Sequence, residues 1–179
     1  MNGAAQQREM NSANNRNSND IVAPQWEQNH RKQFYLHPGQ IFASRECHVV
    51  TTILGSCVSV CLWDPSAKIG GINHFLLPTH TGDGPASPRF GDLAIRELIE
   101  QLIAFGCRQR NLLSKIFGGA CVLKAFQVRA SHLGQRNVQV AEQILAAAGI
   151  PLAGQDVGGQ SGRKLIFQTD DGAAWVKAL

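Results

Sequence analysis

The sequence predicts an α+β fold with mixed sheets and two main amphipathic helices. Three short β-rich runs follow one another at residues 47–54, 57–63 and 69–77, and turn signals at Gly55-Ser56, Asp64-Pro65 and Pro78 separate them. Two later segments, at residues 92–105 and 137–148, repeat apolar side chains with helical spacing. Because the early strands are grouped and do not alternate strictly with helices, an α+β fold is favoured over a single parallel sheet.

The remaining elements follow from local signals in chain order. Residues 82–89 (GDGPASPR) contain two prolines and two glycines and predict a loop. Each predicted helix carries its apolar residues on one face, and glycine ends each of them, at Gly106 and at Gly149. The stretches 112–117, 151–157 and 164–169 predict further strands with Gly-rich junctions.

Length and composition indicate one domain with a core of its own. The chain has 179 residues, of which 44% are hydrophobic and 17% are charged. The first 20 residues are polar and rich in Asn, and cannot bury enough surface to offset the entropy lost on ordering. We therefore predict a disordered polar tail and approach segment over residues 1–32, and a single domain over residues 33–179.

Charge and cysteine content exclude several classes of protein. The net charge is +4 without a basic block, which argues against nucleic-acid binding and a polybasic membrane patch. The chain has no apolar run of about 18 residues and no secretory signal pattern, so we expect a cytoplasmic protein without membrane insertion. An odd number of cysteines predicts free thiols in a reducing compartment. They are Cys47, Cys57, Cys61, Cys107 and Cys121.

One of these thiols, Cys57, has a neighbour that could activate it. If residues 57–63 and 69–77 pair antiparallel, with Trp63 near Lys68 or Ile69, then Cys57 lies opposite His74 or Phe75, with Cβ atoms about 5 Å apart. A thiol beside an imidazole is the minimal activated nucleophile. Backbone amides around Gly55, Ser56 and Cys57 would then stabilise an oxyanion.

From the residues alone, a catalytic pair and an ordinary buried Cys and His both stay open. Zinc is disfavoured because the chain has no CxxC and no HExxH, and we expect no metal and no cofactor. The absence of GxSxG, GxGxxG and GxxxxGK[ST] disfavours a serine hydrolase, a dinucleotide enzyme and a P-loop NTPase.

The same residues carry a family resemblance. Residues 51–60 (TTILGSCVSV), Asp64-Pro65, Gly70-Gly71 and residues 73–78 (NHFLLP) stand in the order typical of one family, and residues 117–120 (FGGA), 134–138 (GQRNV) and 156–159 (DVGG) continue the pattern. Over residues 33–170 the chain resembles the CheD family of chemoreceptor glutamine deamidases. The resemblance implies a layered α/β/β/α packing like that of glutamine-deamidating toxins.

The resemblance also implies roles for particular residues. The catalytic cysteine falls on Cys57, the histidine on His74, and a threonine six positions before the cysteine, which orients the imidazole, on Thr51. The implied reaction is hydrolysis of glutamine side chains on methyl-accepting chemotaxis receptors to glutamate through a thioester, with release of ammonia. Candidate substrate-binding or oxyanion positions are Gly55, Ser56, Gly118, Gly119, Asn137, Gly158 and Gly159.

Two other functions stay open beside this one. A thiol nucleophile could equally hydrolyse glutamyl methyl esters on the same receptors. A non-enzymatic adaptor could use the same surface around Cys57 to bind receptors or a CheC-type phosphatase. The resemblance also implies such a phosphatase as a partner of an active deamidase.

Overall fold

The computed structural model describes residues 31–82, 84–122 and 132–179. The compact unit that they form extends from Arg31 to Leu179. Its first strand begins at Lys32, one residue before the predicted start of the domain. Apart from Arg31 and Lys32, the predicted tail and approach segment lies outside the described residues.

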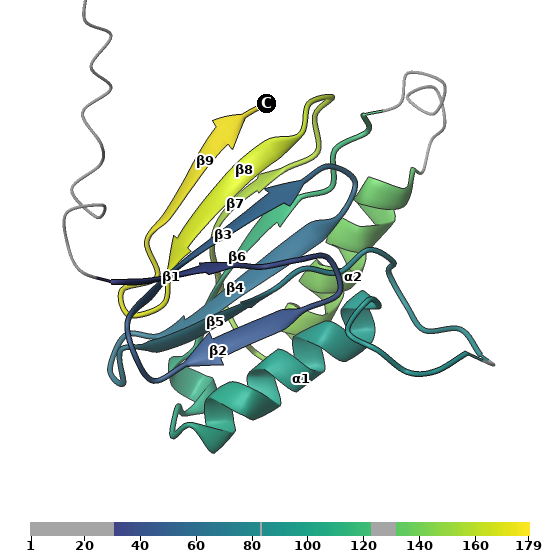
Figure 1. Ribbon diagram of the computed structural model, residues 1–179. Helices are drawn as coiled ribbons and strands as arrows, with labels where there is room; N and C mark the ends of the chain where they lie inside the picture. The colour runs from purple at the N-terminus through teal and green to yellow at the C-terminus, as the bar shows by residue number, and fades with distance from the viewer. Residues whose placement is uncertain (1–30, 83, 123–131) are drawn as a thin grey trace, which may run out of the picture. The chain divides into compact units, whose positions relative to one another are not determined.

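Two β-sheets lie face to face (Figure 1). The four-stranded sheet has the order β1 (Lys32–Tyr35), β3 (His48–Leu54), β8 (Arg163–Gln168) and β9 (Ala174–Ala178). The five-stranded sheet has the order β2 (Ile41–Ser44), β5 (Ile69–Asn73), β4 (Val58–Asp64), β6 (Leu113–Gly118) and β7 (Leu152–Val157). The β1/β3 and β6/β7 pairs are parallel and the other pairs are antiparallel, so the predicted mixed sheets are confirmed.

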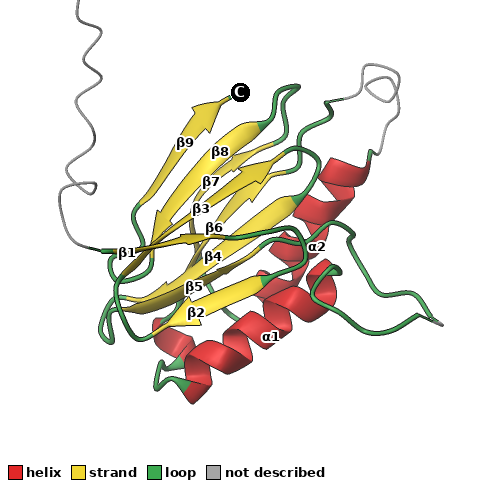
Figure 2. Ribbon diagram, viewed as in Figure 1, coloured by secondary structure: helices red, strands yellow, loops and turns green. Residues whose placement is uncertain are grey.

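Both long helices pack on the five-stranded sheet (Figure 2). They are α1 (Gly91–Ala104) and α2 (Leu133–Ala147), and a short 3-10 turn, η2 (Gln109–Asn111), follows α1. Apolar side chains of the helices and of β4 form one core, and a second core fills the space between the two sheets. The α+β class is therefore confirmed. The described residues form three layers, because both helices lie on the same sheet and no second helix layer covers the four-stranded one.

The predicted elements form close to their predicted positions, and three short strands were missed. The missed strands are β1, β2 and β9, which have four, four and five residues and lack a long apolar pattern. Strand β5 ends at Asn73, although the apolar run continues to residue 77. Helix α2 begins at Leu133, earlier than predicted, because the His132 side chain accepts a hydrogen bond from the Gln135 N–H and caps the first turn. Among the described residues, no helix is long and apolar enough to cross a membrane.

Candidate active site

The segment that carries Cys57 crosses from one sheet to the other. Strand β3 ends at Leu54 in the four-stranded sheet, and β4 begins at Val58 in the five-stranded sheet. Two backbone hydrogen bonds hold the crossing: the Gly119 N–H donates to the Cys57 carbonyl at 2.8 Å, and the Ala120 N–H donates to the Gly55 carbonyl at 2.8 Å. The crossing segment is thus anchored to the residues that follow β6.

The residues after β6 lie so close to the backbone of Cys57 that position 118 requires glycine. Gly118 has a φ of +107°, and a Cβ atom there would lie 2.2 Å from the Cys57 carbonyl oxygen. Gly158 donates its N–H to the Gly118 carbonyl, and Gly159 accepts from the Cys121 N–H. The structure therefore brings together glycines that the resemblance marks as candidate substrate-binding or oxyanion positions, and their backbones support the segment that carries Cys57.

The strand register places Cys57 and His74 on one face of the five-stranded sheet. The β4/β5 pairing continues through a bridge between Val58 and Phe75, so His74 lies opposite Ser59. Cys57 is therefore a diagonal neighbour of His74, still within reach of a long side chain. The predicted antiparallel pairing is confirmed, but the register is offset by one or two residues from the prediction.

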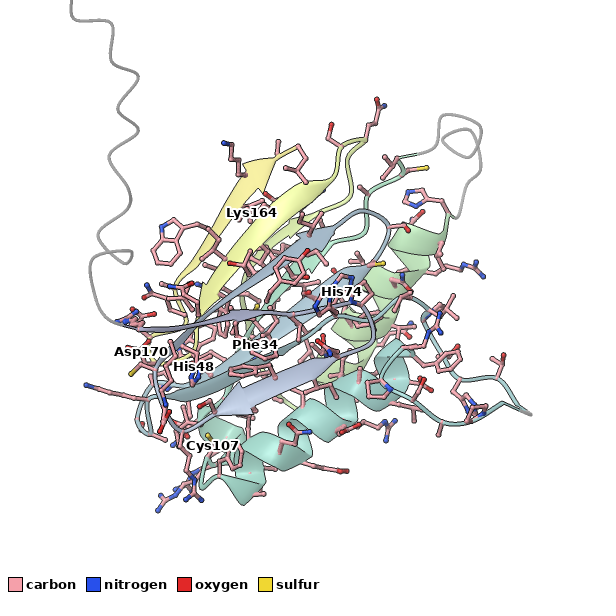
Figure 3. The ribbon with its side chains drawn as sticks, in the orientation of Figure 1. Phe34, His48, His74, Cys107, Lys164 and Asp170 are labelled. Carbon is pink, nitrogen blue, oxygen red and sulfur yellow. The ribbon has the colours of Figure 1, made fainter. Side chains whose placement is uncertain are left out.

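This shared face looks toward the four-stranded sheet. Cys57 is half-buried and packs against the core between the sheets, which also contains Ile72, two residues before His74. The His74 side chain, labelled in Figure 3, is only 1% exposed. Since side chains alternate along a strand, the nucleophile candidate and the imidazole both lie between the sheets.

The hydroxyl that contacts His74 belongs to Thr52. Its Oγ1 lies 2.8 Å from His74 Nδ1, and Thr52 is fully buried. The inward-facing residues of β3 include Val50 and Leu54, so alternation turns Thr51 to the opposite, outer face. The prediction that Thr51 orients the imidazole is therefore wrong in this structure. Because Thr51 and Thr52 are adjacent and point to opposite faces of β3, the threonine that contacts His74 is the one on the buried face.

The hydrogen-bond network assigns the tautomer of His74. Thr52 Oγ1 also lies 2.8 Å from the Leu36 carbonyl oxygen, which can only accept. The single hydroxyl hydrogen of Thr52 therefore goes to Leu36, and Oγ1 accepts the hydrogen on His74 Nδ1. The lone pair of His74 is then on Nε2, which is buried and has no hydrogen-bond partner among the described residues. Such a nitrogen is an available base.

Burial holds both members of the pair in their neutral forms. It raises the pKa of the Cys57 thiol above its ordinary value. It also lowers the pKa of His74 to about 4. At neutral pH the resting site therefore contains a thiol and a neutral imidazole, and not a thiolate and an imidazolium.

Asn137 ties the two halves of the site together. It is fully buried on α2, and its Nδ2 donates to the Ser56 carbonyl at 3.0 Å and to the Leu76 carbonyl at 2.9 Å. Ser56 precedes Cys57, and Leu76 lies two residues after His74. Both amide hydrogens are used in these bonds, so Asn137 positions the segments that carry the two side chains. The family resemblance predicts a substrate-binding or oxyanion position at Asn137, and this stays a prediction.

Comparisons with known proteins agree with the family resemblance. The family described as CheD chemotactic sensory transduction matches residues 76–178. A probable chemoreceptor glutamine deamidase CheD 1 of Anaeromyxobacter dehalogenans is 52% identical over 149 residues, 83% of this chain and 86% of that protein. The chain belongs to the CheD family.

Other CheD proteins are similar over nearly the same span. Probable chemoreceptor glutamine deamidases of Sulfurimonas denitrificans and Trichlorobacter lovleyi are 40% and 41% identical, over 80% and 79% of this chain and 92% and 87% of their own lengths. Among solved structures, the Bacillus licheniformis hypothetical protein YfiH matches with a TM-score of 0.41 and 15% identity, over 62% of this chain and 49% of that one.

The other four thiols of this CheD-family chain differ from one another in burial. Cys61, Cys107 and Cys121 are buried, and Cys47 is exposed. Burial raises the pKa of Cys61 and of Cys107, as it does that of Cys57, so the direction of the pKa shift does not separate Cys57 from these two thiols. Within the described residues, no group of three or more His, Cys, Asp or Glu side chains could hold a metal ion.

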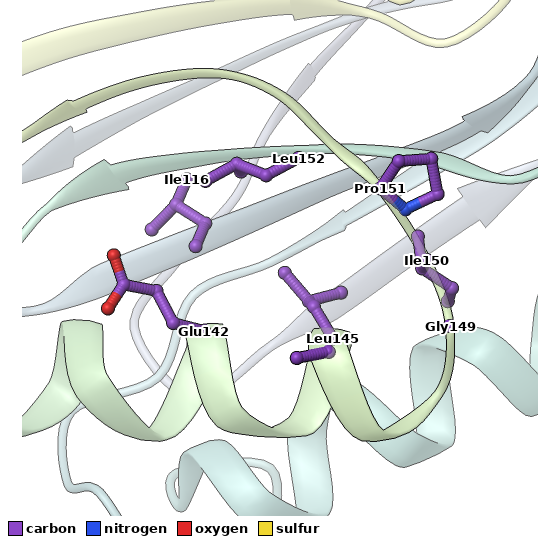
Figure 4. A pocket seen from close by; sticks show the side chains of 8 residues that line it. Ile116, Glu142, Leu145, Gly149, Ile150, Pro151 and Leu152 are labelled. Atoms are coloured by element: carbon purple, nitrogen blue, oxygen red, sulfur yellow. The ribbon is translucent and has the colours of Figure 1, made fainter.

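A separate hollow lies beside α2 (Figure 4). It has a volume of about 370 Å³ and lies between α2 and the β6–β7 edge, where Glu142, Leu145 and Ile116 line it together with residues 149–152. None of its lining residues belongs to the site around Cys57 and His74.

Proposed function

We propose that this chain is a protein-glutamine deamidase acting on methyl-accepting chemotaxis receptors, with Cys57 as the nucleophile and His74 as the base. The names of its CheD relatives support the substrate class. The hydrogen bond from His74 Nδ1 to Thr52 carries the proposal for the chemistry, because it leaves Nε2 free on the face that Cys57 shares.

The first half-reaction would form a thioester. Nε2 takes the proton of the Cys57 thiol while sulfur attacks the carboxamide carbon of glutamine. The C–S bond forms, and backbone N–H groups of the segment 55–57 donate to the oxyanion. When the C–N bond breaks, the imidazolium returns the proton to the nitrogen, which leaves as ammonia.

The second half-reaction would release glutamate. Nε2 takes a proton from water as the water oxygen attacks the thioester carbon. The C–S bond then breaks, and the same proton restores the thiol of Cys57. One water is consumed and one ammonia is released, so the chemistry requires no cofactor.

Cys57 and His74 are both neutral in the resting site, so positive charge is energetically costly at the step in which His74 becomes an imidazolium. Burial disfavours the imidazolium, so charge on His74 forms only as sulfur attacks. Thr52 accepts a hydrogen bond from Nδ1 but bears no charge, and it stabilises the imidazolium less than a carboxylate would. Thr52 therefore sets the tautomer and the ring orientation first, and supplies little electrostatic stabilisation.

Replacement of the nucleophile tests the proposal. Wild-type protein should convert glutamine to glutamate in a receptor's cytoplasmic fragment, as read by peptide mass spectrometry, and Cys57→Ala should abolish the conversion. Cys47→Ala is the matched control, since this thiol is exposed and lies outside the site. Unchanged conversion by Cys57→Ala would refute the mechanism. A CheC-type phosphatase partner and a cytoplasmic location stay predictions.

A further inference from the structure

Ser59 of β4 is a fully buried residue on the same face of the sheet as Cys57 and His74. Cys57 and Cys61, two positions before and after it, pack against the core between the sheets, so alternation turns the Ser59 side chain into the same space. His74 also faces this space, because its Nδ1 contacts Thr52 of the four-stranded sheet. The hydroxyl of Ser59 and the imidazole of His74 therefore share one environment.

The strand register places Ser59 directly opposite His74. The backbones of Val58 and Phe75 exchange two hydrogen bonds, at 3.1 and 3.0 Å, and Ser59 and His74 are the next pair in antiparallel order. A pair that follows a hydrogen-bonded pair is of the non-hydrogen-bonded kind, in which opposite side chains lie closest. Ser59 is thus the direct cross-strand neighbour of the imidazole.

Each member of this pair carries a buried polar atom without a partner. Neither Ser59 Oγ nor His74 Nε2 has a hydrogen-bond partner among the described residues, so the two atoms are not bonded to each other in the resting site. A buried hydroxyl left unsatisfied destabilises a folded protein. Such a group in a native structure calls for an explanation, and a catalytic role is one of the few available.

Among the described residues, no charged side chain stabilises the imidazolium of His74, since burial is the cause of its lowered pKa. The charged side chains that face the space between the sheets from neighbouring strands are Lys115 of β6 and Arg163 of β8. Lys115 Nζ donates to the Gly172 carbonyl at 2.7 Å, and Arg163 forms an ion pair with Asp156. Stabilisation on the Nε2 side must therefore come from a neutral dipole, such as the hydroxyl opposite.

We propose that Ser59 is a further catalytic residue, whose Oγ accepts a hydrogen bond from His74 Nε2 only when His74 becomes an imidazolium. The inference rests on the proposed function, in which Nε2 takes the thiol proton of Cys57. Oγ keeps its own hydrogen and shares the Nε2 proton in a three-centre bond until that proton passes to the leaving nitrogen. An interaction that forms only with the charge lowers the activation barrier and does not strengthen substrate binding.

Replacement of Ser59 by alanine tests the proposal, because it removes the hydroxyl and keeps a small side chain. Ser114→Ala is the matched control. Ser114 is also buried, on β6, but its Oγ donates to the Pro151 carbonyl at 2.9 Å. It pairs with Leu62, which packs in the core beneath the helices, so Ser114 lies on the opposite face of the same sheet.

The two variants should have opposite effects. Ser59→Ala should raise the midpoint of urea denaturation, because it removes an unsatisfied group, and should lower kcat on a glutamine peptide about tenfold with KM unchanged. Nitrogen NMR should show that His74 takes up its proton at a lower pH in Ser59→Ala than in wild type. Ser114→Ala should lower the midpoint, because a hydrogen bond is lost, and should leave kcat and the titration of His74 unchanged.

A wild-type kcat in Ser59→Ala would overturn the proposal, and so would a lower denaturation midpoint or an unchanged titration of His74. Denaturation and NMR do not depend on activity. If wild-type protein converts no glutamine, but Ser59→Ala still raises the midpoint and shifts the titration of His74, the contact with Nε2 stands and the proposed function fails. The two failures are therefore distinguishable.

Discussion

Replacement of Thr52 by valine is the sharpest test of how His74 is positioned. Valine has nearly the shape of threonine but no hydroxyl, so the Leu36 carbonyl loses its donor and His74 Nδ1 loses its acceptor, both of them 2.8 Å away in the wild type. A buried polar group left unsatisfied costs about 1–3 kcal/mol, so two such groups predict a loss of about 2–6 kcal/mol in the free energy of unfolding. Urea denaturation measures this loss.

The same replacement should slow the chemistry without weakening substrate binding. Without Thr52, the tautomer with hydrogen on Nε2 is no longer disfavoured, and that tautomer cannot accept the thiol proton. We expect kcat to fall about tenfold to hundredfold, which corresponds to about 1.4–2.7 kcal/mol of activation free energy, with KM unchanged. Nitrogen NMR of the imidazole reports the tautomer directly.

Two further variants make the result decisive. Thr52→Ser keeps the hydroxyl and should restore most of the rate. Thr51→Val removes a hydroxyl from the outer face of β3 and should leave kcat on a short glutamine peptide unchanged. The reasoning is refuted if Thr51→Val loses activity while Thr52→Val keeps it, because the family's threonine would then act from position 51 after all.

Two other predictions follow from the site. Because the pKa of His74 falls from 6.5 to about 4 on folding, the unfolded chain binds the extra proton, and about 3 kcal/mol of stability present above pH 6.5 is lost as the pH falls through about 4. Chemical denaturation across this pH range should show that the free energy of unfolding depends less on pH in His74→Gln than in wild type. An identical pH profile in the two proteins would contradict the lowered pKa of His74. Gly118→Ala should lower both stability and activity, because the added Cβ meets the Cys57 carbonyl oxygen at 2.2 Å. Gly106→Ala, at a φ of +104° with nothing within 4 Å of the Cβ, measures the backbone strain of about 1–3 kcal/mol alone, and equal losses in the two variants would show that the contact with Cys57 is unimportant.

Local sequence signals were sufficient for much of the fold. The apolar stripes predict α1 and α2, and turn residues delimit β3 to β5, because side-chain periodicity and turn chemistry act within a few residues. The edge strands β1, β2 and β9 were missed because four or five residues carry too little periodic signal. The second helix layer was an expectation from resemblance, and the described residues place both helices on one sheet.

The sequence by itself predicted the candidate pair: a thiol at Cys57 and an imidazole at His74, 17 residues apart and at the open end of the β4/β5 hairpin. Only the tertiary structure decided which residues position these two side chains. An offset of one residue in a strand exchanges its two faces, so the choice of Thr52 over Thr51 depends on packing between sheets. The support from Gly118 and the tie through Asn137 likewise depend on segments that lie far apart in the chain, and only folding brings them to Cys57.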